Sequence, residues 1–163
     1  MRYRTIQGEI IMDELTQLID KNFYVITHLF EYGSLKSEIL PNDKTKARVI
    51  SNRFQSISEI KSYLLGIYVS SEVNRLLYAY FDDRPLYFEE NGELMTWVDL
   101  IPGAGYFGKT DQYQISMLTK TSDEISCVVS VPIYVDTGEE PEVIDYTVSA
   151  QRENGWKLTH LFG

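Results

Sequence analysis

The sequence of 163 residues has one cysteine, two histidines and no long run of apolar residues. The single thiol, Cys127, excludes an internal disulfide. Two histidines, His28 and His160, are few for a hydrolase whose nucleophile needs a neighbouring base, and few for a zinc site with several nitrogen and sulfur ligands. Because no segment approaches the ~18 consecutive apolar residues of a membrane-spanning helix, we also expect no membrane insertion.

Positive charge is also scarce. The chain has 15 lysines and arginines against 24 aspartates and glutamates, which gives a formal net charge of -9. Such a surface repels the phosphates of nucleic acids and favours a partner with a basic surface. A net negative charge also keeps a protein in solution without any further role. We therefore expect no nucleic-acid partner, while the charge alone leaves both a basic partner and simple solubility open.

Apolar and aromatic residues, by contrast, are abundant. They make up 44% and 13% of the chain, with 12 tyrosines and 7 phenylalanines. This composition excludes a disordered or low-complexity chain. A chain of about 150 residues is long enough to bury a sizeable core within one domain. We therefore predict a single domain over residues 1–163, mainly helical over 1–83 and antiparallel sheet over 84–163.

Three segments in the first half have apolar residues every three or four positions, the spacing of one helix face. The longest covers residues 10–30 and is expected to end at Gly33, because glycine suits the position just past a helix. Ser56 stands three residues before Glu59, the spacing of a capping box, and begins a second helix. A third helix begins with Glu72 in its first turn.

Alternating apolar and polar residues predict antiparallel strands in the rest of the chain. The expected strands lie near residues 47–54, within 86–98, and in 112–117, 125–131, 144–150 and 156–162. Asn91-Gly92 is well suited to a two-residue hairpin, Asn154-Gly155 repeats it, and an acidic turn runs from Asp136 to Glu142. Each helix and strand has one apolar face. We therefore predict an α+β fold with N-terminal helices packed on a strongly bent antiparallel sheet, cystatin-like or nuclear-transport-factor-like.

Few residues fit a catalytic pattern. Cys127 alternates in phase with apolar neighbours and is expected to pack in the core. His28 is expected to be a core or partly covered ring. His160 is predicted to share a strand face with Trp156 and Leu158, either as a satisfied histidine at a sheet edge or as part of a pocket. No residues have metal-ligand spacing, so we expect neither a metal nor another cofactor.

The glycine-rich loop DLIPGAGYFG covers residues 99–108. It lacks the preceding parallel strand, the following helix and the Gly-Lys-Ser/Thr ending of a phosphate-binding loop. Pro102 and the glycines allow a sharp turn that exposes Tyr106 and Phe107, an arrangement suited to contact with a partner. An equally good alternative is that both aromatic rings fold inward over the core.

The chain resembles the IseA-type DL-endopeptidase (autolysin) inhibitor family in four segments that occur in the same order: SISEIKSYLLGIYVSSEVNRLLYAYF, LYFEENGELMTW, GAGYFG and RENGWKLTHLF. The resemblance extends over about residues 50–163. Members are small extracytoplasmic bacterial proteins that restrain the enzymes cutting cell-wall peptidoglycan. The resemblance therefore implies an inhibitor with no enzymatic activity, secreted or in the cell wall, whose signal segment would precede this numbering.

The resemblance also implies inhibition by occlusion, in which an acidic surface and a protruding loop plug the active-site cleft of a basic-surfaced cell-wall endopeptidase. The expected partner-binding residues are those of the glycine-rich loop. Asp99 would supply charge, Pro102, Gly103 and Gly105 would supply shape, and Tyr106 and Phe107 would be anchors.

Two other functions are open. A small-ligand-binding or isomerase-like domain would use a pocket inside the bent sheet, lined by Trp156, His160 and strand-facing tyrosines. Asp145 and Tyr146 are not a suitable catalytic pair for such a site, because neighbours on a strand point to opposite faces. An acidic immunity-type protein would use its charge to bind another molecule. The sequence leaves the oligomeric state open.

Overall fold

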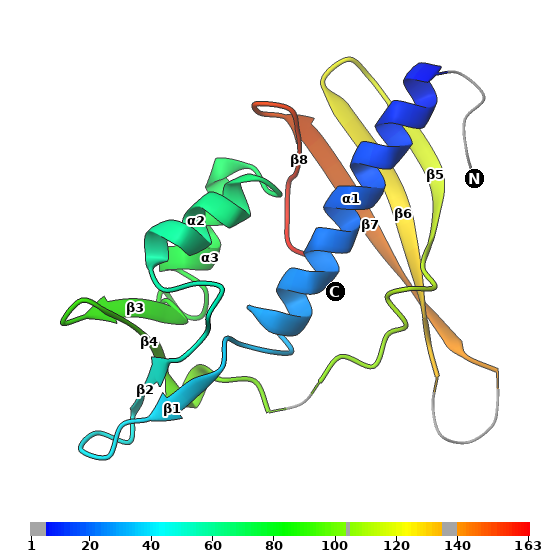
Figure 1. Ribbon diagram of the computed structural model, residues 1–163. Coiled ribbons are helices and arrows are strands. Elements are labelled where there is room, and N and C mark those ends of the chain that lie inside the picture. The colour runs from blue at the N-terminus through cyan, green and yellow to red at the C-terminus, as the bar shows by residue number, and fades with distance from the viewer. Residues whose placement is uncertain (1–5, 104, 135–139) are drawn as a thin grey trace.

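The computed structural model describes residues 6–103, 105–134 and 140–163, with side chains from Met12 onward (Figure 1). The elements in chain order are α1 (Ile6–His28), β1 (Ser37–Ile39), β2 (Lys46–Val49), α2 (Ile57–Leu65), α3 (Ser70–Tyr78), β3 (Tyr87–Glu90), β4 (Glu93–Trp97), the 3-10 helix η1 (Val98–Leu100), β5 (Gln114–Lys120), β6 (Glu124–Ile133), β7 (Glu142–Arg152) and β8 (Trp156–Leu158). Most of the acidic turn expected after residue 135 lies outside the described residues.

The strands form two antiparallel four-stranded sheets. The first has the order β1-β2-β4-β3 and the second the order β5-β6-β7-β8. In the first sheet, β2 from the helical half of the chain pairs with β4, so that Lys46 lies opposite Trp97. The prediction of an α+β fold with an antiparallel sheet packed against helices is confirmed, and β1 is a strand that the sequence pattern did not reveal.

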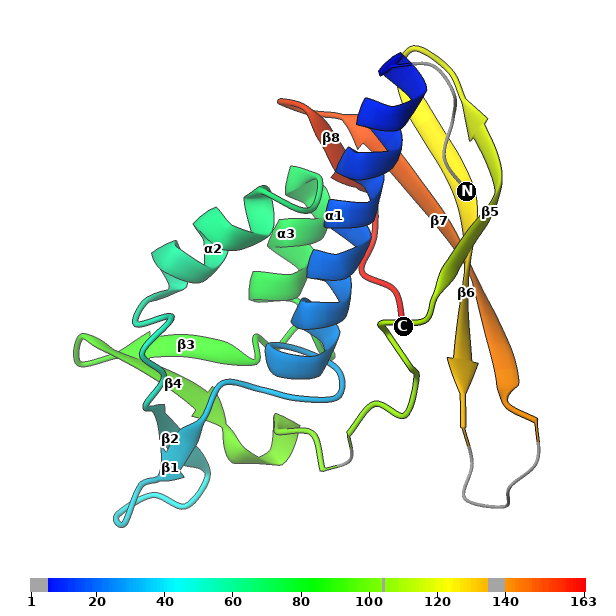
Figure 2. The same ribbon diagram turned by 45° about the vertical axis from the view of Figure 1, so that its right-hand side comes forward.

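The helices lie between the sheets. In Figures 1 and 2, α1 runs along the second sheet. Helices α2 and α3 lie on the side of α1 that faces away from this sheet, above the first sheet. The apolar residues of α1 are therefore buried from both sides, and several of them, Leu15, Ile19 and Ile26, have at most 1% of their surface exposed. They belong to one cluster of buried hydrophobic side chains that includes residues from both sheets.

The prediction of one long first helix is confirmed, but its end differs from the expected one. The helix ends at His28, and Glu31, with φ of 71°, takes the left-handed position that was expected of Gly33. The Tyr32 N–H donates to the Ile26 carbonyl at 2.9 Å, a bond that closes helix ends of this kind. Gly33 is required for a different reason, since a Cβ there would collide with the Thr27 carbonyl oxygen.

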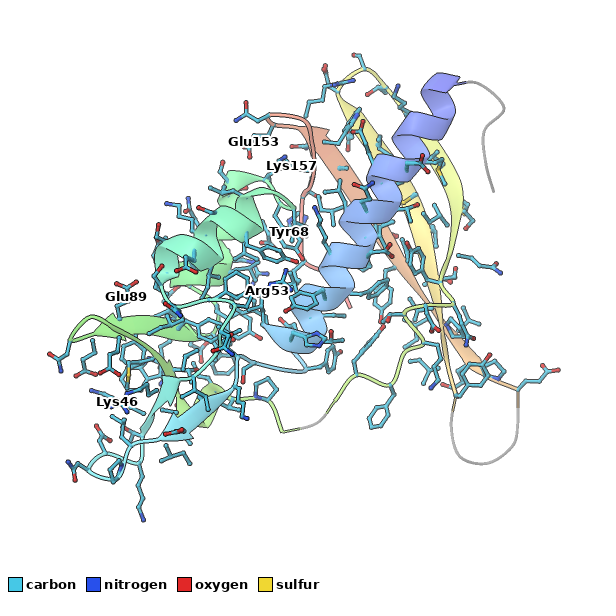
Figure 3. All side chains as sticks on the ribbon, in the orientation of Figure 1. Lys46, Arg53, Tyr68, Glu89, Glu153 and Lys157 are labelled. Carbon is cyan, nitrogen blue, oxygen red and sulfur yellow. The ribbon has the colours of Figure 1, made fainter. Side chains whose placement is uncertain are left out.

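Carboxylates and a hydroxyl cap the two shorter helices. The Ser56 hydroxyl accepts from the Glu59 N–H at 3.1 Å, so the predicted helix start is confirmed. Glu89 accepts from the Ile57 N–H at 2.8 Å, and Glu153 accepts from the Ser70 N–H at 2.7 Å; both glutamates are labelled in Figure 3. Negative groups are stabilising at helix N-termini, so these bonds tie each helix to a distant hairpin.

Both Asn-Gly pairs form turns. Asn91 and Gly92 have φ of 52° and 77°, and Asn154 and Gly155 have φ of 56° and 97°, the left-handed values that tight hairpins need. The first turn joins β3 and β4 through two residues, as predicted, whereas the second leaves three residues between β7 and β8. The last strand is shorter than expected and ends at Leu158.

The chain after β8 leaves the sheet and docks between α1 and α3. Asn22, fully buried, donates to the Phe162 carbonyl at 2.8 Å and accepts from the Phe162 N–H at 3.2 Å and from the Tyr68 hydroxyl at 2.8 Å. Glu72, only 3% exposed, accepts from the Leu161 N–H at 2.7 Å and from Arg75. Leu161 and Phe162 are therefore held by the buried side chains of Asn22 and Glu72, whereas the Thr159 N–H still donates to the Ser149 carbonyl of β7 at 3.0 Å. The predicted strand stops early because the chain turns toward α1 and α3 after that bond.

Candidate functional site

The glycine-rich loop is the connection that crosses from the first sheet to the second (Figure 2). At its start, the Val98 N–H donates to the Thr45 carbonyl at 3.0 Å. At its end, the Lys109 N–H donates to the Pro132 carbonyl at 2.8 Å, and Gly108 forms an isolated bridge with Ile133. Backbone hydrogen bonds to both sheets thus fix the two ends of the loop.

Tyr106 anchors the loop from inside. Its hydroxyl lies 3.1 Å from the hydroxyl of Tyr146, and its ring centroid lies 4.9 Å from that of Tyr32 and 6.4 Å from that of Phe23. Burial, followed by the hydrogen bond to Tyr146, raises the pKa of Tyr106 above the ordinary value for tyrosine. A Cβ on Gly108 would meet this ring, so glycine there makes room for the inward position of Tyr106.

Phe107 points the other way. It is 72% exposed, one of the most exposed large apolar side chains of the described chain. The sequence left two alternatives open, both rings outward or both rings inward. In the structure, Phe107 points outward and Tyr106 points inward. The adjacent aromatic pair in the sequence could have indicated this split, because neighbouring side chains in an extended chain point to opposite sides. Which of the two rings lies inside depends on the residues that contact Tyr106.

Asp99 lies in η1, where its charge has a partner. The Arg84 guanidinium donates to its two oxygens at 2.8 and 3.2 Å and lies 5.3 Å from the Trp97 ring centroid. The hydrogen bond from Arg84 is the main reason why the pKa of Asp99 is lowered from its ordinary value. The charge expected of Asp99 is thus compensated locally in the free protein.

The remaining predicted site residues lie on the surface of the same loop. Pro102 is partly exposed, and Gly103 and Gly105 are exposed. A Cβ on either glycine would meet no atom within 4 Å, so the fold gives no steric reason for glycine at these two positions. They leave the loop surface uncovered beside Phe107.

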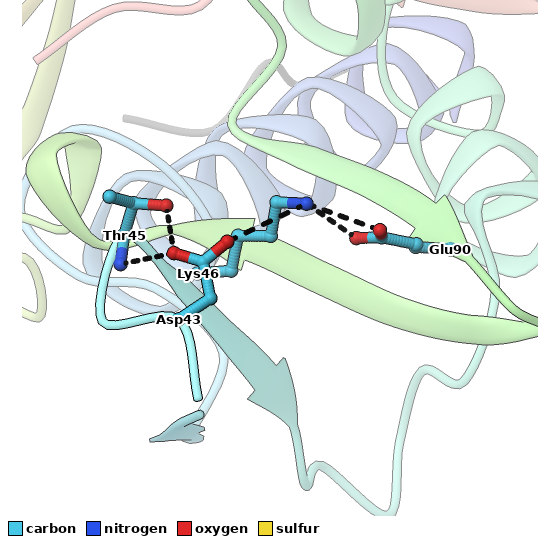
Figure 4. Close-up of polar contacts among 4 residues, drawn as sticks. All are labelled: Asp43, Thr45, Lys46 and Glu90. Atoms are coloured by element: carbon cyan, nitrogen blue, oxygen red, sulfur yellow. Dashed lines mark hydrogen bonds and ion pairs between the residues drawn. The ribbon is translucent and has the colours of Figure 1, made fainter. Parts of the chain in front are cut away.

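Where the loop leaves the first sheet, the sheet's outer face is covered by paired charges. Lys46 donates to Glu90 at 3.0 and 3.1 Å and lies 3.9 Å from Asp43, whose carboxylate also accepts from Thr45 (Figure 4). The Lys46 ammonium also lies 5.7 Å from the centroid of the Trp97 ring. These contacts satisfy the charges of this face within the protein.

A groove lies between α1 and β5, beyond the end of the loop. Its cavity volume is about 1130 Å³. The α1 side contributes Met12, Asp13, Thr16, Asp20, Phe23, Tyr24, Thr27 and His28, and the other side is formed by Thr110, Asp111 and residues 113–116. The Tyr113 hydroxyl spans the two walls and donates to Asp20 at 2.8 Å. Sequence reasoning missed this groove, because its walls are about a hundred residues apart in the chain.

The groove does not contain the pocket residues expected for a ligand-binding domain. Trp156 is 6% exposed and stacks under Arg152, whereas His160 lies on the surface after β8 with its Nδ1 3.0 Å from the Thr159 hydroxyl. The prediction that Trp156 and His160 share one face and line a pocket is wrong, because the strand ends before residue 160.

Other chemistry-bearing residues have structural surroundings. Cys127 is buried as predicted, and burial raises the pKa of its thiol to about 11. His28 is exposed, contrary to the predicted core or partly covered ring, and stacks on Tyr24 with ring centroids 4.4 Å apart. Among the described residues, no group of three or more histidine, cysteine, aspartate or glutamate side chains is arranged to hold a metal ion.

Neither a scan against protein-family models nor a search of curated proteins finds a match to this chain. No helix in the described part of the chain is long and apolar enough to cross a membrane.

Proposed function

We propose that the protein is a non-enzymatic inhibitor of a peptidoglycan DL-endopeptidase, a cell-wall autolysin, and acts outside the cytoplasm by placing the loop from Asp99 to Gly108 in the active-site cleft of the enzyme. The observation that carries the proposal is the split between two neighbouring aromatic residues. Tyr106 is bonded inward to Tyr146, and Phe107 is 72% exposed on the same loop.

An exposed aromatic ring on an anchored loop is a suitable binding residue. A few buried aromatic side chains provide most of the affinity in many protein interfaces. Holding the loop in place before binding reduces the conformational entropy that binding removes. Phe107 would therefore be the main anchor, with Pro102, Gly103 and Gly105 shaping the surface around it.

The net charge supports the choice of partner. A protein with a formal charge of -9 is attracted to an enzyme with a basic surface around its cleft, which raises the association rate and suppresses wrong partners. The resemblance of the loop and the flanking hairpins to the inhibitor family points to the same class of enzyme.

Cleavage of muropeptides by a purified DL-endopeptidase tests the proposal. We expect the protein to suppress cleavage and Phe107→Ala to weaken inhibition at least tenfold, since a buried aromatic anchor is usually worth more than 1.4 kcal/mol. Met117→Ala is the matched control, because Met117 is 79% exposed on β5, outside the loop. Undiminished cleavage at a large molar excess of the protein would contradict the proposed function.

A further inference from the structure

The groove between α1 and β5 has a free strand edge along one wall. β5 is the first strand in the order β5-β6-β7-β8, and within the described chain only β6 pairs with it. The backbone groups on its other edge have no strand partner in the described chain, and pairing with such an edge is a common way in which proteins bind an extended peptide. The bulge between Ser116 and Thr119 ends the regular part of this edge.

The helical wall of the groove is longer than the extended part of the opposite wall. From Met12 to His28 the helix rises about 24 Å at 1.5 Å per residue. On the opposite wall, residues 110–112 form a turn, and the extended part from Tyr113 to Ser116 covers about 10 Å at 3.3 Å per residue step. A groove of this length and of about 1130 Å³ fits an extended segment of roughly six to seven residues better than a compact metabolite.

The charge of the residues that line the groove determines which charge a bound segment should have. Asp13, Asp20 and Asp111 are all exposed along the groove, and no lysine or arginine occurs among the described residues that line it. Only Asp20 has a bond across the groove, from the Tyr113 hydroxyl, and a carboxylate can accept several more. A cationic side chain in the groove would therefore meet carboxylates on both walls.

Aromatic rings lie between these carboxylates. Phe23 and Tyr113 have ring centroids 5.4 Å apart, and Tyr24 stacks on His28 at one end. Such rings hold both apolar side chains and the stems and charges of lysine and arginine. The groove thus contains both aromatic and acidic side chains, which suit an extended segment that has apolar and basic residues.

We infer that this groove binds an extended basic peptide segment of a partner protein, which pairs with the free edge of β5 and places lysine or arginine side chains among Asp13, Asp20 and Asp111. The site is separate from Phe107 and is independent of the proposed inhibition, because it requires only a basic extended segment and no endopeptidase cleft.

Binding of short fluorescent peptides tests the inference with the full chain. The probe is an eight-residue peptide of alternating lysine and valine, and a peptide of alternating glutamate and valine is the charge control. We expect saturable binding of the lysine peptide, weaker binding at higher salt and no binding of the glutamate peptide. In an NMR titration, the largest shifts should fall on residues 110–116 and on the facing side of α1.

Two triple variants separate the groove from the general negative charge. The groove variant D13N/D20N/D111N should bind the lysine peptide about tenfold more weakly, since each exposed ion pair contributes a modest factor. The control variant D82N/D83N/D123N changes the net charge equally at exposed positions outside the groove and should bind within about twofold of the wild type. Thermal unfolding of both variants verifies that they fold.

The backbone contribution has its own probe. N-methylation of alternate residues removes the donors on one edge of the peptide and should weaken binding when that edge faces β5. Equal loss of affinity in both triple variants, equal binding of the glutamate peptide, or no effect of methylation on either edge would overturn the inference. Inhibition of an endopeptidase by the groove variant, with Phe107 intact, is a separate readout that tests only the loop.

Discussion

Two segments without regular secondary structure bridge different parts of this molecule, and they are held in opposite ways. The tail from Thr159 to Phe162 is tied to α1 and α3 through its last two residues, since Leu161 and Phe162 bond Glu72 and Asn22, which are 3% and 0% exposed. The glycine-rich loop from Asp99 to Gly108 is held by backbone bonds beside its two ends and by the partly buried Leu100 and Tyr106, while the ion pair of Asp99 with Arg84 lies in solvent.

The difference is one of burial. A buried polar group that loses its partner costs far more than the bond contributes when both partners can return to water. The tail is therefore fixed by bonds that are expensive to break. The loop is fixed where Leu100 and Tyr106 pack against the core, so that the rest of its surface is left for contact with another molecule.

Substituting Asn22 should produce the largest effect. Asn22→Leu leaves the Phe162 N–H, the Phe162 carbonyl and the Tyr68 hydroxyl without their partner in the core. We expect the free energy of unfolding to fall by about 3 kcal/mol or more, since each unsatisfied buried group costs about 1–3 kcal/mol. Urea denaturation followed by circular dichroism measures the change.

Asn74→Leu is the matched control, because Asn74 is exposed on α3 and its substitution should change the free energy of unfolding by less than about 0.5 kcal/mol. A similar, small effect of both substitutions would show that the tail is not held as described, and the contrast between tail and loop would disappear.

The second-largest effect should be a difference in stability between variants of Tyr106 and Phe107, the two neighbouring aromatic residues of the loop. Tyr106→Ala removes a half-buried ring packed against Tyr32 and Phe23 and leaves the Tyr146 hydroxyl without its partner. We expect a loss of about 2 kcal/mol in the free energy of unfolding, against less than about 0.5 kcal/mol for Phe107→Ala. Equal losses in the same urea titrations would place both rings on the same side of the loop.

Alkaline pH should affect the tail more than the loop. Burial raises the pKa of Tyr68 well above, and that of Tyr106 above, the ordinary tyrosine value. A folded-state pKa above the unfolded one means that the stabilisation is fully present below about pH 10 and is lost as pH rises toward the folded-state pKa. Ionisation of these two tyrosines should therefore reduce the stability of the folded state only above about pH 10.

The fully buried Tyr68 should account for about 1 kcal/mol of the loss at pH 10.5, and the half-buried Tyr106 for less. Tyr68→Phe should accordingly reduce the difference between urea midpoints at pH 8 and pH 10.5 more than Tyr106→Phe does. The reverse order would mean that the loop, rather than the tail, contains the more deeply protected hydroxyl.

Local sequence patterns predicted the helices and hairpins, because their causes are local. The spacing of apolar residues set α1, the Ser56 hydroxyl set the start of α2, and Asn91-Gly92 set a two-residue turn. The pairing of β2 with β4 could not be predicted in this way, since Lys46 and Trp97 are 51 residues apart and each strand alone fits either sheet.

The candidate sites follow the same division. The glycine-rich loop was visible because its composition is unusual within ten residues. The inward position of Tyr106 depends on Tyr146, and the groove depends on α1 lying along β5, so neither leaves a local signal. The alternation continues past Leu158 and so predicts a strand face for His160, whereas the buried Asn22 and Glu72 draw the chain out of the sheet after Thr159.

The exposed ion pair at the start of the loop should have the smallest effect on stability and a distinct effect on association. Arg84 and Asp99 are both well exposed, with side chains 41% and 62% accessible, so Arg84→Ala should leave the urea midpoint unchanged. The substitution also leaves the Asp99 carboxylate uncompensated in the loop that contains Phe107. Association with a basic endopeptidase should then be faster at low salt, by about twofold, and the gain should vanish as salt is raised.

Lys120→Ala removes the same positive charge at the exposed end of β5, away from the loop, and separates this local effect from a change in net charge. Stopped-flow association rates of the two variants should differ only if the partner approaches the η1 end of the loop. Equal rates would mean that the charge of Asp99 has no part in the encounter. The loop would then act through Phe107 and its shape alone. Exposed charge would in that case matter as little for the loop as it does for the tail, which is held by buried bonds.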